Sequence, residues 1–303
     1  MQLRGIVLRS QSGFYAVETP QGEFLARLRG RLKQGRRSGD IVAIGDRVEL
    51  LVEPGAEPTI ESVEPRQRAL VRRDPRPTGE YEQVLIANPD QALFVFACAE
   101  PAPRLRMLDR FLVIAEAQQI PARIVASKVD LVSPQQAEQL FGHYAALGYP
   151  VHFTSVATNQ GIAELREVLQ DKISVLAGPS GTGKSTLINA IQPGLDLRVG
   201  TVQESSGKGK HTTAERLMYK LDRGGYVADT PGLKALALWD IQPEELDGYF
   251  PEFRKLIHQC QFRDCRHLDE PGCAVATAAA SGAVHPARYE SYKLLRVGAK
   301  DET

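Results

Sequence analysis

The first part of the chain alternates apolar and polar residues in short runs that glycine and proline interrupt. Alternation with a period of two is typical of strands with one buried face, and these runs lack the three-to-four spacing of a helix. The pattern predicts strands at residues 3–8, 14–18, 24–28, 41–44 and 47–52. Short strands at such close spacing predict a small all-β barrel over residues 1–70.

The pattern changes at about Gln83, where apolar strands begin to alternate with helical segments. Leu105, Leu108, Phe111 and Leu112 recur three or four residues apart, so they share one face of a helix. Repeated strand–helix units predict a parallel sheet that helices cover on both faces. The expected elements are strands 92–99, 122–126, 150–153, 172–177, 216–221 and 226–228 and helices 105–118, 134–147, 162–169 and 186–191.

The rest of the chain divides into a linker and a tail. Residues 72–79 are rich in charge, proline and glycine, which is typical of a linker. The tail beyond Pro243 is expected to be mostly helical, with one helix over 244–258 and an interruption at a Cys/His cluster. We therefore expect a multidomain protein: a barrel at 1–70, an α/β domain at 83–240 and a small lobe at 241–303.

Lysine and arginine, 37 together, balance 37 aspartates and glutamates, so the chain as a whole does not attract nucleic acid. A basic run in the barrel is either a local nucleic-acid contact or a solvated strand edge and loop: Arg27, Arg29, Arg31, Lys33, Arg36 and Arg37. Five short strands with a basic loop are typical of an OB-fold, a common binder of oligonucleotides.

No apolar run approaches the ~18–20 residues of a membrane span, and the N-terminus lacks the apolar stretch of an export signal. Three of the four cysteines crowd near the C-terminus, while Cys98 lies in an apolar run typical of a core. Such usage favours a reduced compartment over a disulfide scaffold. We expect a cytoplasmic monomer without a membrane partner.

A glycine-rich sequence follows the expected strand 172–177 and opens the expected helix 186–191. Glycines let backbone N–H groups turn toward phosphate oxygens, and the helix N-terminus adds partial positive charge. Lys184 is suited to neutralise the β- and γ-phosphates and the Ser185 hydroxyl to ligate Mg²⁺. The alternative is a glycine-rich turn without a ligand. The expected phosphate-binding residues are Gly178, Pro179, Ser180, Gly181, Thr182, Gly183, Lys184, Ser185 and Thr186.

A second motif, Asp229-Thr-Pro-Gly232, follows the expected strand 226–228. Asp229 can hold Mg²⁺ through water, and the Gly232 N–H can sense the γ-phosphate. Upstream, a glycine-flanked loop offers Thr212 and Thr213, and the sequence does not choose which of them ligates Mg²⁺ while the γ-phosphate is present. The alternative for this loop is a basic surface loop.

Ser127-Lys-Val-Asp130, at the end of the expected strand 122–126, has the pattern of a guanine-recognition tetrad. The Asp130 carboxylate can accept from guanine N1–H and the 2-amino group, whereas adenine leaves both interactions unmade. The Lys128 stem can cover the ring face. Ser127 replaces the usual asparagine, which predicts weakened guanine affinity.

The order of these motifs is more informative than any one of them. The tetrad precedes the phosphate loop, whereas in Ras-like GTPases the phosphate loop comes first. If both interpretations hold, the chain is a circularly permuted GTPase. Ser155 and Val156, after the expected strand 150–153, could then form a loop over the base edge, although their sequence matches the usual pattern poorly.

Leu233 follows the Asp-x-x-Gly motif at the position of the glutamine that orients water in Ras-like enzymes. An apolar side chain cannot orient water, so intrinsic hydrolysis should be slow, on the order of 10⁻⁴–10⁻² s⁻¹. His211 is the candidate substitute, because a neutral imidazole can position or deprotonate water. The alternative is a surface histidine without a role. His211, Lys184 and Thr213 are the expected catalytic residues.

Cys260, Cys265, His267 and Cys273 offer three thiolates and one imidazole in a short, turn-prone stretch. Four soft or borderline ligands suit one closed, structural Zn²⁺ site. The competing idea is a reactive thiol cluster. The segment after Gly232 leads through the expected helix 244–258 into this cluster, so a γ-phosphate could shift the lobe along a short covalent path.

With these residues the whole chain resembles the ribosome small subunit-dependent GTPase A (RsgA, or YjeQ) family. The resemblance covers the barrel with Val42-Ala-Ile-Gly-Asp46, the permuted GTPase motifs and the Cys/Cys/His/Cys lobe. It implies a GTPase of late small-subunit maturation that docks on ribosomal RNA in the GTP state and hydrolyses GTP as it is released. Ser127 and the region of Ser155 and Val156 depart from the family pattern.

Two other functions are compatible with parts of this sequence. A P-loop ATPase or small-molecule kinase with a zinc lobe predicts no preference for guanine. An RNA-binding module with a vestigial nucleotide site predicts that Lys184→Ala leaves ribosome-linked behaviour intact. The filled phosphate-contacting positions disfavour the second.

Overall fold

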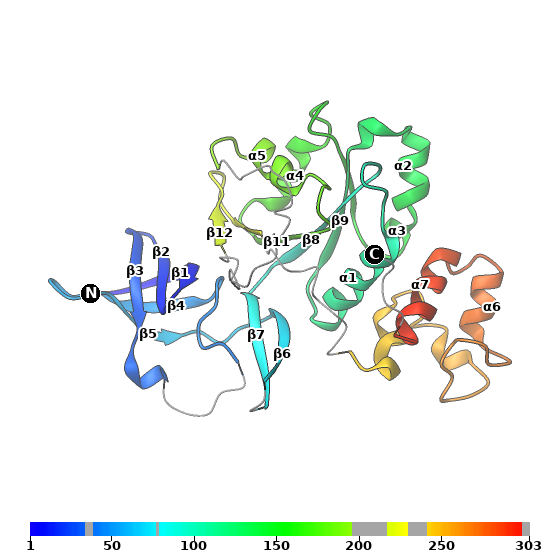
Figure 1. The fold of residues 1–303 in the computed structure, drawn as a ribbon, viewed down its shortest axis with the longest axis horizontal. Coiled ribbons are helices and arrows are strands. Elements are labelled where there is room, and N and C mark those ends of the chain that lie inside the picture. The colour runs from blue at the N-terminus through cyan, green and yellow to red at the C-terminus, as the bar shows by residue number, and fades with distance from the viewer. Residues whose placement is uncertain (34–38, 77–78, 196–216, 230–240, 299–303) are drawn as a thin grey trace, which may run out of the picture.

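The computed structural model describes residues 1–33, 39–76, 79–195, 217–229 and 241–298. A β-barrel, an α/β unit and a C-terminal lobe follow one another along the chain, and the barrel and the lobe lie on opposite sides of the α/β unit (Figure 1). The fold therefore has the expected multidomain architecture.

The barrel is closed. Its strands are β1 (Gln2–Gln11), β2 (Phe14–Thr19), β3 (Gly22–Leu28), β4 (Arg47–Leu51) and β5 (Thr59–Val63). They follow the order β1-β2-β3-β5-β4, and β1 also pairs with β4, which closes the circle. The β3–β5 pair is parallel and the others are antiparallel. Closure leaves few edges, as in an OB-fold.

Residues 41–44, expected as a strand, form a turn instead, and the fifth strand is β5. The Asp46 carboxylate accepts a hydrogen bond from the Ala43 N–H at 2.7 Å and forms an ion pair with Arg66. Gly45 has φ +85°, and a Cβ there would lie 2.1 Å from the Ala87 carbonyl oxygen. The apolar pattern that suggested a strand reflects the burial of this turn in the core.

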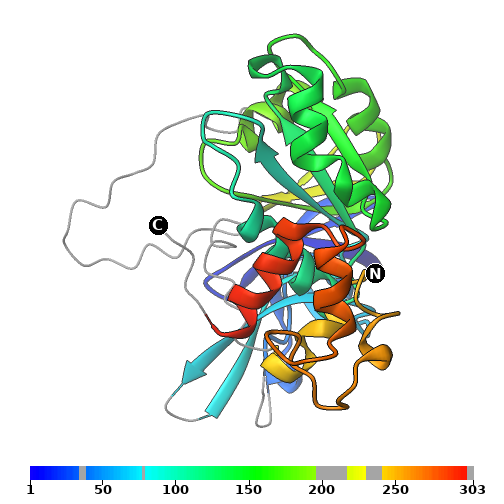
Figure 2. The ribbon, with the colours of Figure 1, turned by 90° about the vertical axis from the view of Figure 1, so that its right-hand side faces the viewer.

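The described residues of the linker expected over 72–79 lie in strands instead. Strands β6 (Ala69–Arg76) and β7 (Gly79–Ala87) pair in an antiparallel hairpin that projects from the body (Figure 2). Asp40 anchors its base, because its carboxylate accepts from the Tyr81 hydroxyl at 2.6 Å and the Val84 N–H at 2.9 Å. Proline and charge are compatible with a two-stranded ribbon, since both of its strands are edges.

The α/β unit contains a mainly parallel sheet, with the order β10-β9-β8-β11-β13-β12 and β12 antiparallel at one end. Its strands are β8 (Gln91–Ala97), β9 (Ala122–Ser127), β10 (Val151–Thr154), β11 (Ile173–Ala177), β12 (Leu217–Lys220) and β13 (Tyr226–Asp229). Every residue of β8 is buried, as expected for a strand covered on both faces.

Helices cover both faces of this sheet. They are α1 (Leu105–Ala117), α2 (Pro134–Phe141), α3 (His143–Ala146), α4 (Ile162–Leu169) and α5 (Lys184–Ile191). Phe111 of α1 packs with Phe94 and Phe96, whereas Leu165 and Leu187 of α4 and α5 belong to the core on the other face. The single helix expected over 134–147 is two helices that meet at Gly142, where Ala145 N–H bonds three residues back.

The barrel joins the sheet at β12. Arg9 of β1 pairs with Leu217 of β12, and Lys220 forms an ion pair with Glu18 of β2. The barrel is thus hydrogen-bonded to the edge of the α/β sheet as well as covalently linked to it.

The C-terminal lobe contains the 3₁₀ helices η4 (Pro243–Tyr249) and η5 (Ile257–Gln259) and the helices α6 (Ala274–Ala280) and α7 (Pro286–Arg296). The helix expected over 244–258 is wrong: Phe250 N–H bonds to Asp247 and Phe253 N–H to Phe250, both three residues back. Pro251 has no N–H for a continuous α-helix, so tighter turns replace it. Among the residues that the structure describes, no helix has the length and apolar character of a membrane span.

Candidate functional site

The glycine-rich sequence connects β11 to α5, as the motif requires. Gly178 has φ +153°, and a Cβ there would lie 2.1 Å from the Val95 carbonyl oxygen of β8, so only glycine fits. Gly181 and Gly183 have φ of +82° and +84°. These positions turn the loop at the N-terminus of α5, where free N–H groups and the helix dipole favour an anion.

The side chains of this loop hold it in shape. Lys184 Nζ donates to the carbonyls of Gly178 at 2.9 Å and Pro179 at 2.7 Å, and the Thr182 hydroxyl donates to Pro179 at 3.0 Å. Ser185 lies with Thr186 in the first turn of α5, and both are partly buried. Ser180 is exposed at the tip. The lysine therefore lies over the loop in which phosphates are expected.

The structure brings the tetrad beside this loop. Strand β9 ends at Ser127, two strands from β11, and the carboxyl ends of parallel strands meet at one edge of the sheet. The buried Ser127 hydroxyl donates to the carbonyl of the buried Thr182 at 2.8 Å. Lys128 donates to the Glu100 carbonyl in the loop after β8, and Asp130 is exposed in η2 (Val129–Leu131). Segments 55 residues apart thus meet in one place.

Ser155 and Val156 follow β10, which is the neighbour of β9. Ser155 is buried and accepts from the Thr158 N–H at 3.2 Å, whereas Val156 is 38% exposed. Thr154, which precedes Ser155, lies in register with Ser127, so the turn after β10 begins next to the tetrad.

Several expected residues lie wholly or partly outside the described residues. The backbone of Asp229 lies in register with Leu176, just before the phosphate loop, but its side chain lies outside the described part of the structure. The remaining ones lie outside the described residues altogether: His211, Thr212, Thr213, Gly232 and Leu233.

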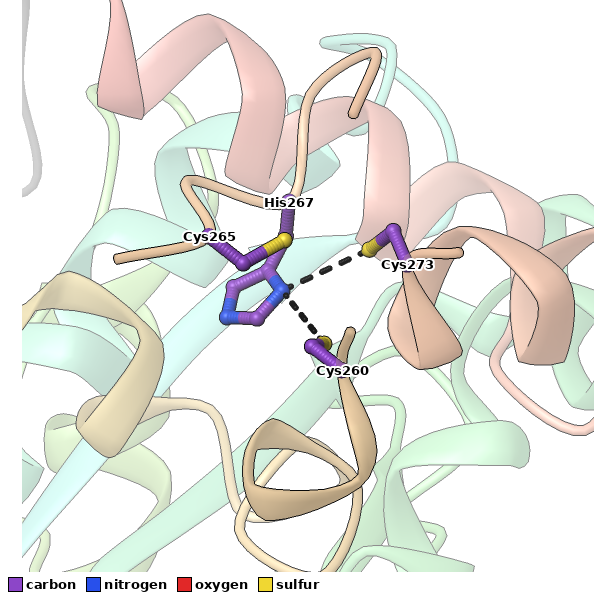
Figure 3. A group of neighbouring side chains, drawn as sticks. All are labelled: Cys260, Cys265, His267 and Cys273. Carbon is purple, nitrogen blue, oxygen red and sulfur yellow. Dashed lines mark hydrogen bonds between the residues drawn. The ribbon is translucent and has the colours of Figure 1, made fainter. Parts of the chain in front are cut away.

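The Cys/His cluster assembles as expected (Figure 3). The ligand atoms of Cys260, Cys265, His267 and Cys273 all lie within 4.8 Å of one another. His267 Nδ1 is 3.5 Å from the sulfur of both Cys260 and Cys273. A tetrahedral Zn²⁺ at about 2.3 Å from sulfur and about 2.0 Å from nitrogen separates such atoms by about 3.5 Å. The donor set and its spacing fit zinc.

Two carboxylates beside this cluster were not predicted. Asp247 Oδ2 is 3.2 Å from His267 Nε2, and this hydrogen bond lowers the pKa of Asp247. Glu270 accepts from the N–H groups of Arg266 at 3.2 Å and Leu268 at 2.9 Å, on either side of His267. No sequence signal reveals Asp247, because it lies 20 residues before its partner.

Cys98 has the structural role expected from its apolar run. It is 3% exposed directly after the buried strand β8, and burial raises the pKa of its thiol to about 11, with a smaller contribution from Asp130. A thiol of this kind stays protonated and unreactive at neutral pH.

The order of these sites along the chain, on a P-loop α/β sheet flanked by a barrel and a Cys/His lobe, defines a circularly permuted GTPase. The family model described as RsgA GTPase matches residues 63–239, and the one described as RsgA N-terminal domain matches residues 4–60. The chain belongs to the RsgA GTPase family.

Relatives agree along nearly the whole chain. A protein of Gemmatimonas aurantiaca named small ribosomal subunit biogenesis GTPase RsgA is 48% identical, with 96% of each chain covered. A protein of Moorella thermoacetica with the same name is 42% identical, with 96% of this chain and 95% of the relative covered.

Solved structures agree as well. YjeQ from Thermotoga maritima matches with a TM-score of 0.79 at 36% identity over all of both chains. YloQ, described as a circularly permuted GTPase, matches with a TM-score of 0.75 at 31% identity over 100% of this chain and 98% of that one.

Proposed function

We propose that this chain hydrolyses GTP to GDP and phosphate during late maturation of the small ribosomal subunit, which stimulates it and from which it is then released. The observation that carries the nucleotide part is the 2.8 Å hydrogen bond from Ser127 to Thr182, because it unites the tetrad and the phosphate loop in one site. The partner follows from relatives at 48% and 42% identity that are named for small-subunit biogenesis.

Three groups of residues divide the work on the nucleotide. The loop 178–183 and the N-terminus of α5 receive the phosphates, and Lys184 exchanges its loop carbonyls for phosphate oxygens. Asp130 is exposed before the nucleotide binds. Its carboxylate accepts hydrogen bonds from the guanine edge, and the Lys128 stem covers the ring. Ser155 and Val156 border the base from the next strand.

Mg²⁺, when bound with the nucleotide, neutralises charge that develops on the phosphates. Ser185, Asp229 and either Thr212 or Thr213 are the proposed ligands. His211 is the proposed group that positions the attacking water, since Leu233 cannot. The Gly232 N–H is proposed to sense the γ-phosphate.

The lobe is proposed to hold one structural Zn²⁺ through Cys260, Cys265, His267 and Cys273. With all four positions taken by protein there is no open position for catalysis, so the ion contributes to folding. The ribosomal RNA contact is proposed for the barrel and lobe, and a cytoplasmic monomer remains the expectation.

GTP turnover with and without purified small subunits tests the function. We expect slow turnover of the free protein, a rise of at least tenfold with small subunits, and little response to large subunits. Turnover that ignores small subunits would remove the ribosomal assignment. The His211→Ala variant should lose the stimulated rate while keeping GTP affinity, and unchanged stimulation would exclude His211.

Nucleotide competition tests the base preference separately. Labelled GTP should be displaced by GTP and GDP but not by ATP at the same concentration, because adenine offers no N1–H and no 2-amino donor to Asp130. Equal displacement by ATP would favour an ATPase or kinase. A Lys184→Ala variant that still responded normally to subunits would indicate a vestigial site.

A further inference from the structure

The histidine of the Cys/His cluster has two ring nitrogens with different neighbours. Nδ1 faces the sulfur atoms of Cys260 and Cys273 at 3.5 Å, and Nε2 faces Asp247 Oδ2 at 3.2 Å. The imidazole is buried, with a residue exposure of 1%. Because a metal-bound imidazole is neutral, one nitrogen carries the ion and the other must carry the proton.

Resting on the proposed zinc site, we propose that Asp247 is its outer-shell positioning residue, and that it makes metal binding fasten η4 to the lobe. The carboxylate accepts a hydrogen bond from Nε2–H, which leaves the Nδ1 lone pair free for the metal on the side of the ring where the cysteine sulfurs lie. Carboxylates in this position fix the tautomer and ring orientation of zinc-bound histidines.

Neighbouring groups hold the backbone of His267 in a fixed conformation. His267 has φ +58°, a left-handed conformation that is uncommon for a residue with a Cβ. The Glu270 carboxylate bonds the N–H groups on either side of it, and the Tyr289 hydroxyl donates to the His267 carbonyl at 3.1 Å. These contacts hold the His267 backbone in place, and its imidazole lies against Asp247.

Asp247 is equally well held on its own element. Its Oδ1 accepts from the Gly248 N–H at 2.8 Å, which leaves Oδ2 for His267. Its neighbour Leu246 is 2% exposed and packs in the same core as Val113 of α1. Thus η4 is the first described element after β13, and two adjacent side chains connect it to its surroundings. Asp247 connects it to the metal ligand His267, and Leu246 connects it to α1.

The consequence is an energetic link between the metal and η4. Metal binding favours the Nε2–H tautomer, which strengthens the hydrogen bond to Asp247 and holds η4. Conversely, Asp247 raises metal affinity by pre-orienting the ring, as reciprocal linkage requires. Loss of such outer-shell partners typically weakens metal binding about 10–100-fold.

The first test measures Zn²⁺ affinity of the full chain by competition with a chromophoric chelator. We expect Asp247→Leu to bind Zn²⁺ about 10–100-fold more weakly and Asp247→Asn to lie between it and the unaltered chain, because the amide oxygen still accepts a hydrogen bond from Nε2–H. Glu245→Gln is the matched control: it removes a charge from an exposed position of η4 and should leave the affinity unchanged. Equal affinities for Asp247→Leu and Glu245→Gln would overturn the proposal.

The second test is amide hydrogen exchange of residues 243–250 with and without Zn²⁺. In the unaltered chain, metal removal should speed exchange there. In Asp247→Leu, exchange should be fast in both states, and a metal effect of the same size as in the unaltered chain would contradict the link. Long-range ¹H–¹⁵N NMR of the zinc-loaded chain should find the proton on Nε2 of His267, and a proton on Nδ1 would equally contradict it.

These outcomes separate the two levels of inference. Failure of the unaltered chain to bind Zn²⁺ in the chelator competition would remove the metal site itself. Tight binding that Asp247 does not affect would leave the site intact and remove only the role of Asp247.

Discussion

At the scale of single residues, close approach of two strands decides the identity of Gly178. The loop leaves β11 directly against β8, and a side chain at Gly178 would meet the Val95 carbonyl oxygen. The glycine that a motif search recognises for its phosphate contacts is therefore also required by the packing of the sheet.

Gly178→Ala should therefore impair folding as well as nucleotide binding. We expect the free energy of unfolding to fall by about 1–3 kcal/mol, the usual cost of overpacking, and GTP affinity to fall with it. Urea unfolding of the nucleotide-free chain measures the first effect. Gly30→Ala is the control, because its Cβ would meet open space and its φ is ordinary, and equal stability of both variants would contradict the steric argument.

His143 predicts a pH dependence. Its imidazole stacks on His285 at 4.0 Å, and neither of its buried ring nitrogens has a hydrogen-bond partner among the described residues. Burial, then the neighbouring His285 and Arg288, lowers its pKa from 6.5 to about 4, and Glu252 opposes this only in part.

The unfolded chain therefore binds more protons than the folded chain between these two pKa values. The stability that depends on neutral His143 is present above about pH 6.5 and is lost as the pH falls toward about 4. Chemical denaturation across this range should show a steeper loss for the unaltered chain than for His143→Phe, which keeps the ring stack without the titration. Parallel profiles would exclude His143 as the cause.

At the scale of elements, α1 is packed on two sides. Leu108, Phe111 and Leu112 face the sheet, as their spacing predicted. Asp109 and Val113, four residues apart on the other side, face the lobe. In sequence the acidic residue suggests a solvated surface, so the second buried side was not recognisable.

A buried ion network holds this second side. The Arg288 guanidinium on α7, fully buried, donates to Asp109 and to Glu252 at 2.7 Å each, and the Tyr144 hydroxyl donates to Asp109 at 2.7 Å. Charges removed from water this completely are stable only while all partners are present.

Arg288→Ala should accordingly destabilise the protein by about 3–5 kcal/mol, because two carboxylates are left buried without a counter-charge. Arg254→Ala is the matched control at the same interface. Its side chain is 50% exposed where it pairs with Glu116 of α1, so its loss should cost about 0–1 kcal/mol. Calorimetry of both variants measures the two losses of stability. A small loss for Arg288→Ala would mean that water enters this interface.

At the scale of the whole molecule, the lobe packs against α1. Gly232, where the expected covalent path to the cluster begins, lies outside the described residues, and from Pro243 onward the chain passes through 3₁₀ turns instead of the continuous helix expected over 244–258. The loop that precedes α1 also reaches the nucleotide site, since Glu100 accepts from Lys128 and Pro101 borders Gly181. If the nucleotide affects the lobe, these contacts offer a packed route beside the covalent one, and Arg288→Ala, which removes a contact of the lobe with α1, is the variant that tests it.

Metal removal should affect the lobe more than the α/β unit. The lobe core is small and shares residues with the ligand loop, whereas the sheet has large cores on both faces. We expect a strong chelator to loosen residues 241–298 in hydrogen exchange while GTP affinity changes less than threefold. Loss of nucleotide binding in step with zinc would contradict independent folding of the nucleotide site.

The sequence by itself determined what depends on local patterns and covalent spacing. It predicted the barrel, the alternation of strands and helices, the strand–loop–helix at 173–191 and the cysteine and histidine residues that cluster in the lobe, because periodicity reports burial and a motif fixes its own geometry. It misassigned 41–44, 72–79 and 244–258, where a buried turn, a hairpin ribbon and a proline after η4 give the same composition as a strand, a linker and a helix.

Only the tertiary structure decided which polar groups, distant in sequence, meet. Ser127 reaches Thr182 across 55 residues, Asp247 reaches His267 across 20, and Asp109 reaches Arg288 across 179. A polar residue has the same appearance in a sequence whether water or a buried partner satisfies it. The choice is made by the packing of the elements that carry it, and these contacts are the ones that join the nucleotide site, α1 and the lobe.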